Sequence, residues 1–139
     1  MSKFINHLDA RIGKRMEGGK WTRVCILSKD LFYESSILGG TVTVPRAFIS
    51  DGASVPRAFW SLYPPFGKYL EAAVVHDWFC VLGKKGESPI CSKTAARVFL
   101  EAMQVCGVSR WRRRKMYWAV ALGGPRFKAK RKAAKKADN

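Results

Sequence analysis

The chain has 139 residues, of which 47% are hydrophobic and 12% aromatic, enough to build one domain around a buried core. Lysine and arginine number 26 against 10 acidic residues, which gives a formal net charge of +16 at pH 7. This charge argues against the near-neutral surface of an ordinary cytosolic enzyme. It indicates a polyanionic partner, which can be nucleic acid, anionic lipid or an acidic protein. The sequence shows no apolar run of transmembrane length and no secretory signal, so we expect neither.

The first half of the chain is typical of β-structure. Residues 1–20 are polar, end at a Gly-Gly pair and are expected to form an N-terminal segment outside the main domain. Residues 21–27 predict a strand, and residues 31–34 predict a second strand that forms a hairpin with the first through a turn at 28–30. The β-branched residues 41–45 predict a third strand, which Pro45 ends.

The second half has helical periodicity. Residues 68–82 predict a helix with His76 and Cys80 on its apolar face. Ser92 is expected to cap a second helix that runs to residue 106 and stops at Gly107. Ser109 is expected to cap a third helix, which ends near residue 123 and places the following side chains on one side: Trp111, Trp118 and Leu122.

These elements predict an α+β fold, with a small N-terminal antiparallel β part packed on about three helices. The domain is expected to span residues 21–124, and a basic tail follows at 125–139. The cysteines fit no zinc module, and without a secretory signal we expect free thiols.

The positive charge is concentrated at the C-terminal end. Residues 110–139 contain 12 basic residues and one acidic residue, a net charge of +11. Such a tail can be a solvated, solubilising extension or an arm that binds phosphates without reading base sequence. The candidate anion-binding residues are Arg110, Arg112, Arg113, Arg114, Lys115, Lys128, Lys130, Arg131, Lys132, Lys135 and Lys136.

The pair His76-Asp77 lies in the first predicted helix, where adjacent side chains point about 100° apart. The two therefore cannot bond to each other as base and orienting acid. His76 has the side chain best suited to act as a general base near neutral pH, and Asp77 can hold a hard cation or pair with an arginine. The structural alternative is a core histidine beside an ion-paired aspartate.

A further group of candidates lies in the loop that follows the predicted strands. An aspartate before a glycine often bonds its own backbone in an Asx-turn. The functional alternative is that Asp51 reaches His76 and fixes its tautomer, as an orienting carboxylate does in hydrolases. Ser54 lacks the sequence context of a hydrolase nucleophile. The loop motif consists of Asp51, Gly52, Ser54 and Arg57.

Two blocks carry a resemblance to a known family. The segments VPRAFISDGASVPR, PPFGKY and AAVVHDW, followed by a helix containing FLEAM, resemble a family of small phage and prophage proteins. The resemblance covers roughly residues 31–124. It implies a phage-encoded protein and no particular activity.

A weaker likeness concerns the helix that carries His76-Asp77. It is similar to the core of small calcium-dependent phospholipases, which implies a histidine that activates water and an aspartate that binds calcium. Carried over here, His76 would be the base and Asp77 the Ca²⁺ ligand. The acid that orients the histidine in those enzymes is replaced by Ala96, and their framework cysteines are missing.

Two hypotheses follow. The first is a non-catalytic phage virion or assembly component, such as a tail protein. It would act in the particle or in the host cytoplasm and need no cofactor. It would bind DNA or other phage structural proteins through the basic C-terminal region, with homo-oligomers forming inside the assembly. The alternative is a metal-dependent, phospholipase-like hydrolase that acts on lipid or cell-envelope material through His76, Asp77 and Asp51, with Ca²⁺ as its cofactor.

Overall fold

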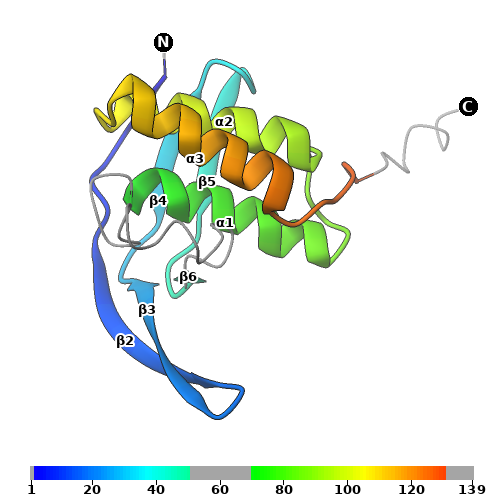
Figure 1. The fold of residues 1–139 in the computed structure, drawn as a ribbon. Helices are drawn as coiled ribbons and strands as arrows, with labels where there is room; N and C mark the ends of the chain where they lie inside the picture. The colour runs from blue at the N-terminus through cyan, green and yellow to red at the C-terminus, as the bar shows by residue number, and fades with distance from the viewer. Residues whose placement is uncertain (1, 51–69, 131–139) are drawn as a thin grey trace, which may run out of the picture.

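The computed structural model describes residues 2–50 and 70–130 of the chain (Figure 1). In these residues the strands are β1 (Lys3–Phe4), β2 (Ala10–Glu17), β3 (Lys20–Leu27), β4 (Leu31–Ser35), β5 (Gly40–Val44) and β6 (Ile49–Ser50). The helices are α1 (Leu70–Lys84), α2 (Ser92–Val105) and α3 (Arg110–Gly123). The strands come first and the helices follow, so the fold is α+β, as predicted.

The strands form two antiparallel sheets with the orders β1-β4-β5 and β2-β3-β6. In β4 the side chains alternate between buried and half-buried, and Leu31, Tyr33 and Ser35 point into the core. This period-2 pattern buries one face of the first sheet against the helices. The strands β4 and β5 form a hairpin in which Gly39 adopts a φ of 69°, a conformation that favours glycine.

The predicted hairpin between residues 21–27 and 31–34 is wrong. Both strands exist, but β3 pairs with β2 and β6, whereas β4 pairs with β1 and β5. Leu27 and Leu31 are both buried on either side of the short connection. The connection therefore carries the chain from one sheet to the other instead of reversing it, because both leucines must reach the core.

Residues 1–20 also differ from the expectation, because they contribute β1 and β2. The strand β2 pairs with β3 along its whole length, from Ala10 opposite Leu27 to Glu17 opposite Lys20. The outer part of this long hairpin reaches away from the helices (Figure 1). Ile12 and Met16 in β2 are more than half exposed, so no buried apolar face marked the strand in the sequence.

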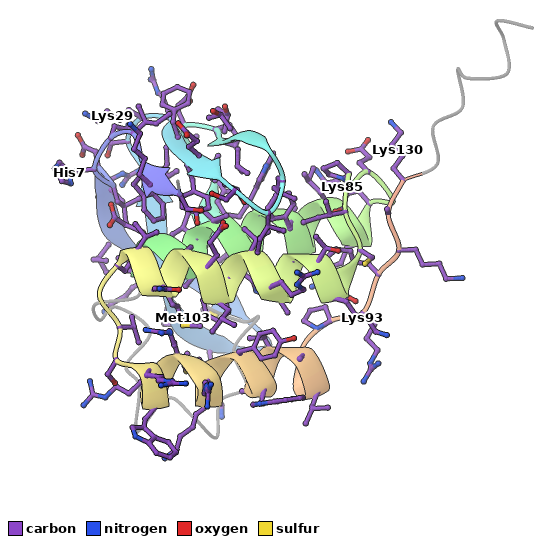
Figure 2. All side chains as sticks on the ribbon, turned by 90° about the horizontal axis from the view of Figure 1, so that it is seen from above. His7, Lys29, Lys85, Lys93, Met103 and Lys130 are labelled. Carbon is purple, nitrogen blue, oxygen red and sulfur yellow. The ribbon has the colours of Figure 1, made fainter. Side chains whose placement is uncertain are left out.

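The helices form layers on the first sheet (Figure 2). The helix α1 contacts β5, β6 and α2, and α3 packs on α2 as the outermost layer. Met103 of α2 and Met116 of α3 are fully buried in this packing. No helix in the described ranges is long and apolar enough to cross a membrane.

The predicted C-terminal ends of the helices agree with the structure to within two residues: α1 ends at Lys84 instead of residue 82, and α2 ends at Val105 instead of residue 106. The predicted start of the first helix, residues 68–69, lies outside the described residues. The N-cap of α2 is Cys91 and not Ser92, which is the first residue of the helix. Gly107, with a φ of 81°, follows the end of α2 as expected. Ser109 is the N-cap of α3.

Glu101 of α2 ties the helical layer to the first sheet. Its Oε1 atom accepts hydrogen bonds from the Tyr33 hydroxyl at 2.7 Å and the Ser35 hydroxyl at 2.8 Å. Its Oε2 atom accepts a third from the Ile37 backbone N–H at 3.1 Å. One carboxylate thus binds both β4 and the turn that leads to β5, and this fixes the position of α2 over the hairpin.

The described part of the basic tail is attached to the domain. The Lys130 N–H donates to the Ser88 carbonyl at 2.7 Å, and the Ser92 N–H donates to the Phe127 carbonyl at 2.9 Å. The Phe127 ring lies against Gly83, where a Cβ atom would overlap it. Residues 125–130 therefore have a fixed place beside the connection between α1 and α2.

Candidate functional site

The His76-Asp77 pair lies in the buried part of α1. The residues of α1 from 72 to 77 are all buried, because α2 covers one side of the helix and β5 and β6 cover another. A surface helix buries one apolar face and exposes the other. In this part of α1, successive residues instead pack against different layers of the fold. His76 and Asp77 therefore contact different elements, as their angular separation requires.

The His76 imidazole faces α2 and is only 4% exposed. Its Nδ1 atom lies 3.7 Å from the Cys80 sulfur, and its ring centroid lies 5.0 Å from that of Phe99. Burial lowers the pKa of His76 to about 4, because a charged imidazolium is poorly solvated there. The ring is neutral at pH 7, and no carboxylate in the described part of the chain bonds to it. The described groups in contact with the ring are thus a thiol and a phenyl ring.

The Asp77 side chain faces the second sheet and is 5% exposed. It accepts a hydrogen bond from the Ser50 hydroxyl of β6. Burial and, next, the charge of Asp77 raise the pKa of two neighbouring thiols, that of Cys25 and that of Cys80, the latter to about 12. Both thiols are therefore protonated and unreactive near neutral pH.

Among the described residues, the groups around Asp77 differ from the all-oxygen ligand set of the calcium site that the phospholipase likeness implies. Calcium takes six to eight oxygen ligands, mostly from carboxylates, carbonyls and water. Asp77 instead bonds the Ser50 hydroxyl and has the thiols of Cys25 and Cys80 nearby, and sulfur is a donor for softer metals. Within residues 2–50 and 70–130, no three His, Cys, Asp or Glu side chains are grouped so that they could hold a metal ion.

The second helix also departs from the phospholipase arrangement. Ala96, at the position of the orienting acid, lines a pocket together with Tyr117 and Phe127. It therefore faces α3 and the C-terminal segment. The α2 residue in ring contact with His76 is Phe99.

All four cysteines are free thiols, as predicted. They differ in environment, since Cys25 and Cys80 are buried whereas Cys91 and Cys106 are half-buried. The Thr94 hydroxyl, 3.4 Å from the Cys91 sulfur, lowers the pKa of that thiol.

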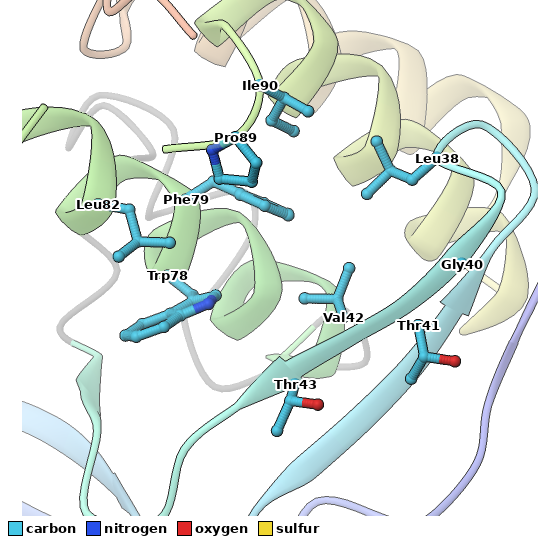
Figure 3. A pocket seen from close by; sticks show the side chains of 10 residues that line it. All are labelled: Leu38, Gly40, Thr41, Val42, Thr43, Trp78, Phe79, Leu82, Pro89 and Ile90. Atoms are coloured by element: carbon cyan, nitrogen blue, oxygen red, sulfur yellow. The ribbon is translucent and has the colours of Figure 1, made fainter. Parts of the chain in front are cut away.

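An apolar pocket of about 390 Å³ lies between β5 and α1 (Figure 3). Trp78, Phe79 and Leu82 enter it from α1, while Val42 and two threonines enter it from β5. The described side chains that line it include no carboxylate, imidazole or thiol. It has space for a small apolar group but lacks the groups needed for acid–base chemistry.

Several predicted residues lie outside the described residues. These are the whole loop motif, Asp51, Gly52, Ser54 and Arg57, and the distal tail residues Arg131, Lys132, Lys135 and Lys136. The predicted contact between Asp51 and His76 therefore remains a prediction.

The cations of α3 are at the surface. Arg110, Arg112, Arg114 and Lys115 are exposed, and none of them pairs with a carboxylate in the described parts of the chain. Arg113 is different: it is half-buried, and its guanidinium donates to the Val108 carbonyl at 3.2 Å. The exposed cations of α3 are thus the predicted ones without Arg113. The Arg113 side chain instead bonds the backbone just before the helix begins.

Three further cations, Lys85, Lys93 and Lys130, lie at the same end of the molecule in the view of Figure 2. The docked segment 125–130 adds Lys128 to them. Lys85 and Lys93 were not among the residues predicted from the sequence, because they lie apart along the chain and only the fold places them at the same end. The available signal was the pair Lys84-Lys85 in a predicted loop.

Residues 25–120 match the family described as protein of unknown function, DUF1353. The chain is 42% identical over 84 residues to the uncharacterized protein y4jT of Sinorhizobium fredii (strain NBRC 101917 / NGR234), an alignment that covers 59% of this chain and 24% of that protein. It is 32% identical over 83 residues to the uncharacterized protein y4iH of the same organism, covering 56% of this chain and 31% of that one. The aligned regions are thus at most about a third of these relatives' length.

No solved structure matches significantly. With most of its length inside the matched region, the chain belongs to the family of proteins of unknown function DUF1353.

Proposed function

We propose that this protein is a non-catalytic component that binds nucleic acid through a basic surface formed by α3 and the segment after it. The observation that carries the proposal is the density of exposed cations on α3: four of the six residues from 110 to 115 are exposed cations, and none of them pairs with a carboxylate in the described chain. Such a concentration of positive charge attracts phosphates.

The docked C-terminal segment supports the same proposal. Lys128 and Lys130 follow α3, and the backbone bonds of residues 127 and 130 fix where they lie. A fixed array of cations loses less conformational entropy on binding than a free tail does. The geometry around His76 favours binding over hydrolysis, because the ring is buried between a thiol and a phenyl group.

A second part of the proposed function concerns where the protein acts. We propose that the protein is phage-encoded and acts in the virion or during its assembly in the host cytoplasm, within a homo-oligomer or beside other phage structural proteins. This rests on the motif resemblance. Mass spectrometry of purified particles tests it: a constant copy number per particle supports it, and absence from particles and from assembly intermediates contradicts it.

The binding proposal is tested by replacing four outward cations of α3 with glutamine: Arg110, Arg112, Arg114 and Lys115. A matched control replaces four exposed cations of the β part: Lys3, Arg11, Lys14 and Arg46. Both variants lose the same formal charge. Fluorescence anisotropy with a labelled oligonucleotide at about 50 mM salt is expected to show roughly a tenfold or greater loss of affinity for the α3 variant alone. Equal losses would indicate a general charge effect. No binding by the wild type, together with binding to an acidic polypeptide such as polyglutamate, would replace nucleic acid with an acidic protein.

A further inference from the structure

The outward face of α3 combines tryptophans and cations in one stripe. Trp111, Trp118 and Leu122 are 77%, 58% and 68% exposed, respectively. Together with Arg114 and Lys115 they line an open groove of about 720 Å³ whose walls are mostly apolar. We call these five residues the tryptophan face.

The periodicity of the helix explains this arrangement. Residues seven apart on an α-helix point in nearly the same direction and lie about 10.5 Å apart along the axis. Trp111 and Trp118 have this spacing, and Arg114 and Lys115 lie between them. The opposite side of the helix is buried through Met116 and Val120, so packing on α2 does not use the tryptophans.

Large exposed apolar side chains on a soluble surface usually mark a contact site. The charge of the face selects an anionic occupant, because its two cations pair with no carboxylate in the described chain. The contact between Tyr117 and Trp118 is edge-to-face, with ring centroids 5.4 Å apart. It holds the Trp118 indole and leaves at least one of its faces open.

We propose that the tryptophan face binds single-stranded nucleic acid, with bases stacked on Trp111 and Trp118 and phosphates bound by Arg114 and Lys115. The inference rests on the proposed function and names its ligand class. Single strands are bound by surfaces that combine cations for the backbone with aromatic rings for the bases. In a duplex the base faces are already stacked on one another, so exposed indoles would find no partner there.

The arrangement favours a single strand over a membrane. A helix that lies in a membrane interface separates a broad apolar face from a cationic face. Here the two cations lie between the two tryptophans along the helix, and the apolar side chains of the groove are those of Trp111, Trp118, Ala119 and Leu122. A nucleotide chain needs both kinds of group at the same place, because each nucleotide carries a base and a phosphate.

The test uses the full chain and a thymidine oligonucleotide of about 20 nucleotides, longer than a typical single-domain site. Trp111→Leu and Trp118→Leu keep an apolar side chain and remove the flat ring. Trp21→Leu, in β3, is the matched control, because Trp21 is 66% exposed and lies outside the face. All three changes are at exposed positions, so each variant is expected to fold, and circular dichroism melts check this.

Each variant of the face is expected to bind the oligonucleotide about 5-fold to 140-fold more weakly than the wild type, the range that loss of one stacked base produces. Trp21→Leu is expected to bind like the wild type, and the oligonucleotide is expected to quench the tryptophan fluorescence of the wild type. The matching duplex should bind more weakly and be insensitive to both changes in the face.

The failures can be distinguished. Equal affinity for single strand and duplex, with no effect of either tryptophan change, overturns the stacking inference and leaves the proposed function standing. Absence of all nucleic-acid binding overturns both. Binding only to phosphatidylcholine vesicles that contain phosphatidylserine, and to no oligonucleotide, overturns both and assigns the face to a membrane surface.

Discussion

The Nδ1 atom of His76 lies 3.7 Å from the sulfur of Cys80, one helical turn further along α1. Both groups are buried, and burial favours the neutral form of each: it lowers the pKa of the imidazole to about 4 and raises that of the thiol to about 12. A reactive Cys–His pair needs a thiolate beside an imidazolium. The geometry therefore makes this pair part of the core.

The buried histidine predicts a pH dependence of stability. The folded-state pKa of about 4 is lower than the ordinary value of 6.5, so the unfolded chain takes up the proton first as the pH falls. The stabilising contribution is complete above about pH 6.5 and is lost towards pH 4, on the order of 3 kcal/mol in total. Urea unfolding between pH 7 and pH 5 should show the free energy of unfolding falling in the wild type and much less in His76→Gln.

The matched control for this slope is His7→Gln, because His7 is exposed. This variant should keep the pH dependence of the wild type. Parallel curves of unfolding free energy against pH for His76→Gln and the wild type would contradict the lowered pKa of His76 and the burial that causes it.

The Glu101 carboxylate predicts a stability effect at the interface of helix and sheet. Tyr33→Phe removes the hydroxyl that donates to Glu101 at 2.7 Å but keeps the buried ring. We expect the free energy of unfolding to fall by about 1.5–3 kcal/mol, the range for a hydrogen bond to a charged group. Tyr117→Phe is the control, because its hydroxyl has no partner within the described chain. Equal losses of unfolding free energy in the two variants would contradict a stabilising hydrogen bond between Tyr33 and Glu101.

The thiols are expected to react in a set order. Cys91 is half-buried, and the hydrogen bond from Thr94 lowers its pKa. Burial raises the pKa of Cys106 to about 11, and Cys25 and Cys80 are buried. Iodoacetamide at neutral pH, followed by peptide mass spectrometry, should therefore modify Cys91 first. Thr94→Val should slow that reaction, and faster labelling of Cys25 or Cys80 in the folded chain would contradict the structure.

Gly83→Ala should release the C-terminal segment. The added Cβ atom would overlap the Phe127 ring, although alanine suits the helix itself. Trypsin is expected to cut after Lys128 and Lys130 severalfold faster in this variant than in the wild type. Gly40→Ala is the control, because a Cβ atom there meets nothing within 4 Å. Unchanged cleavage would mean that Phe127 does not anchor the segment.

The helices could be predicted from the sequence better than the sheets could. Periodic apolar residues and the glycine at 107 located α2, because its apolar stripe at three- and four-residue spacing meets the core. The pairing of strands depends on contacts between residues distant in sequence. The short connection between residues 27 and 31 suggested a hairpin, but the two strands belong to different sheets. The strand β2 was missed because its apolar residues are exposed.

The candidate sites divide in the same way. The cations and tryptophans of α3 were visible as a local pattern, because a helix face can be counted along the chain. The enclosure of His76 was not visible, since it depends on Phe99 from another helix. The orientation of Ala96 towards α3 likewise follows only from tertiary packing, as does the position of Lys85, Lys93 and Lys130 at the same end of the molecule.

The salt dependence of oligonucleotide binding tests the central claim most directly. Affinity is measured between about 50 and 200 mM salt for the wild type, the α3 glutamine variant and the matched β-part variant, and the slope of log K against log salt reports the phosphates contacted. The account predicts that the slope of the α3 variant is shallower by roughly 0.7 for each lost single-strand contact, while the β-part variant keeps the wild-type slope. Identical slopes for all three proteins would contradict binding through the basic face of α3.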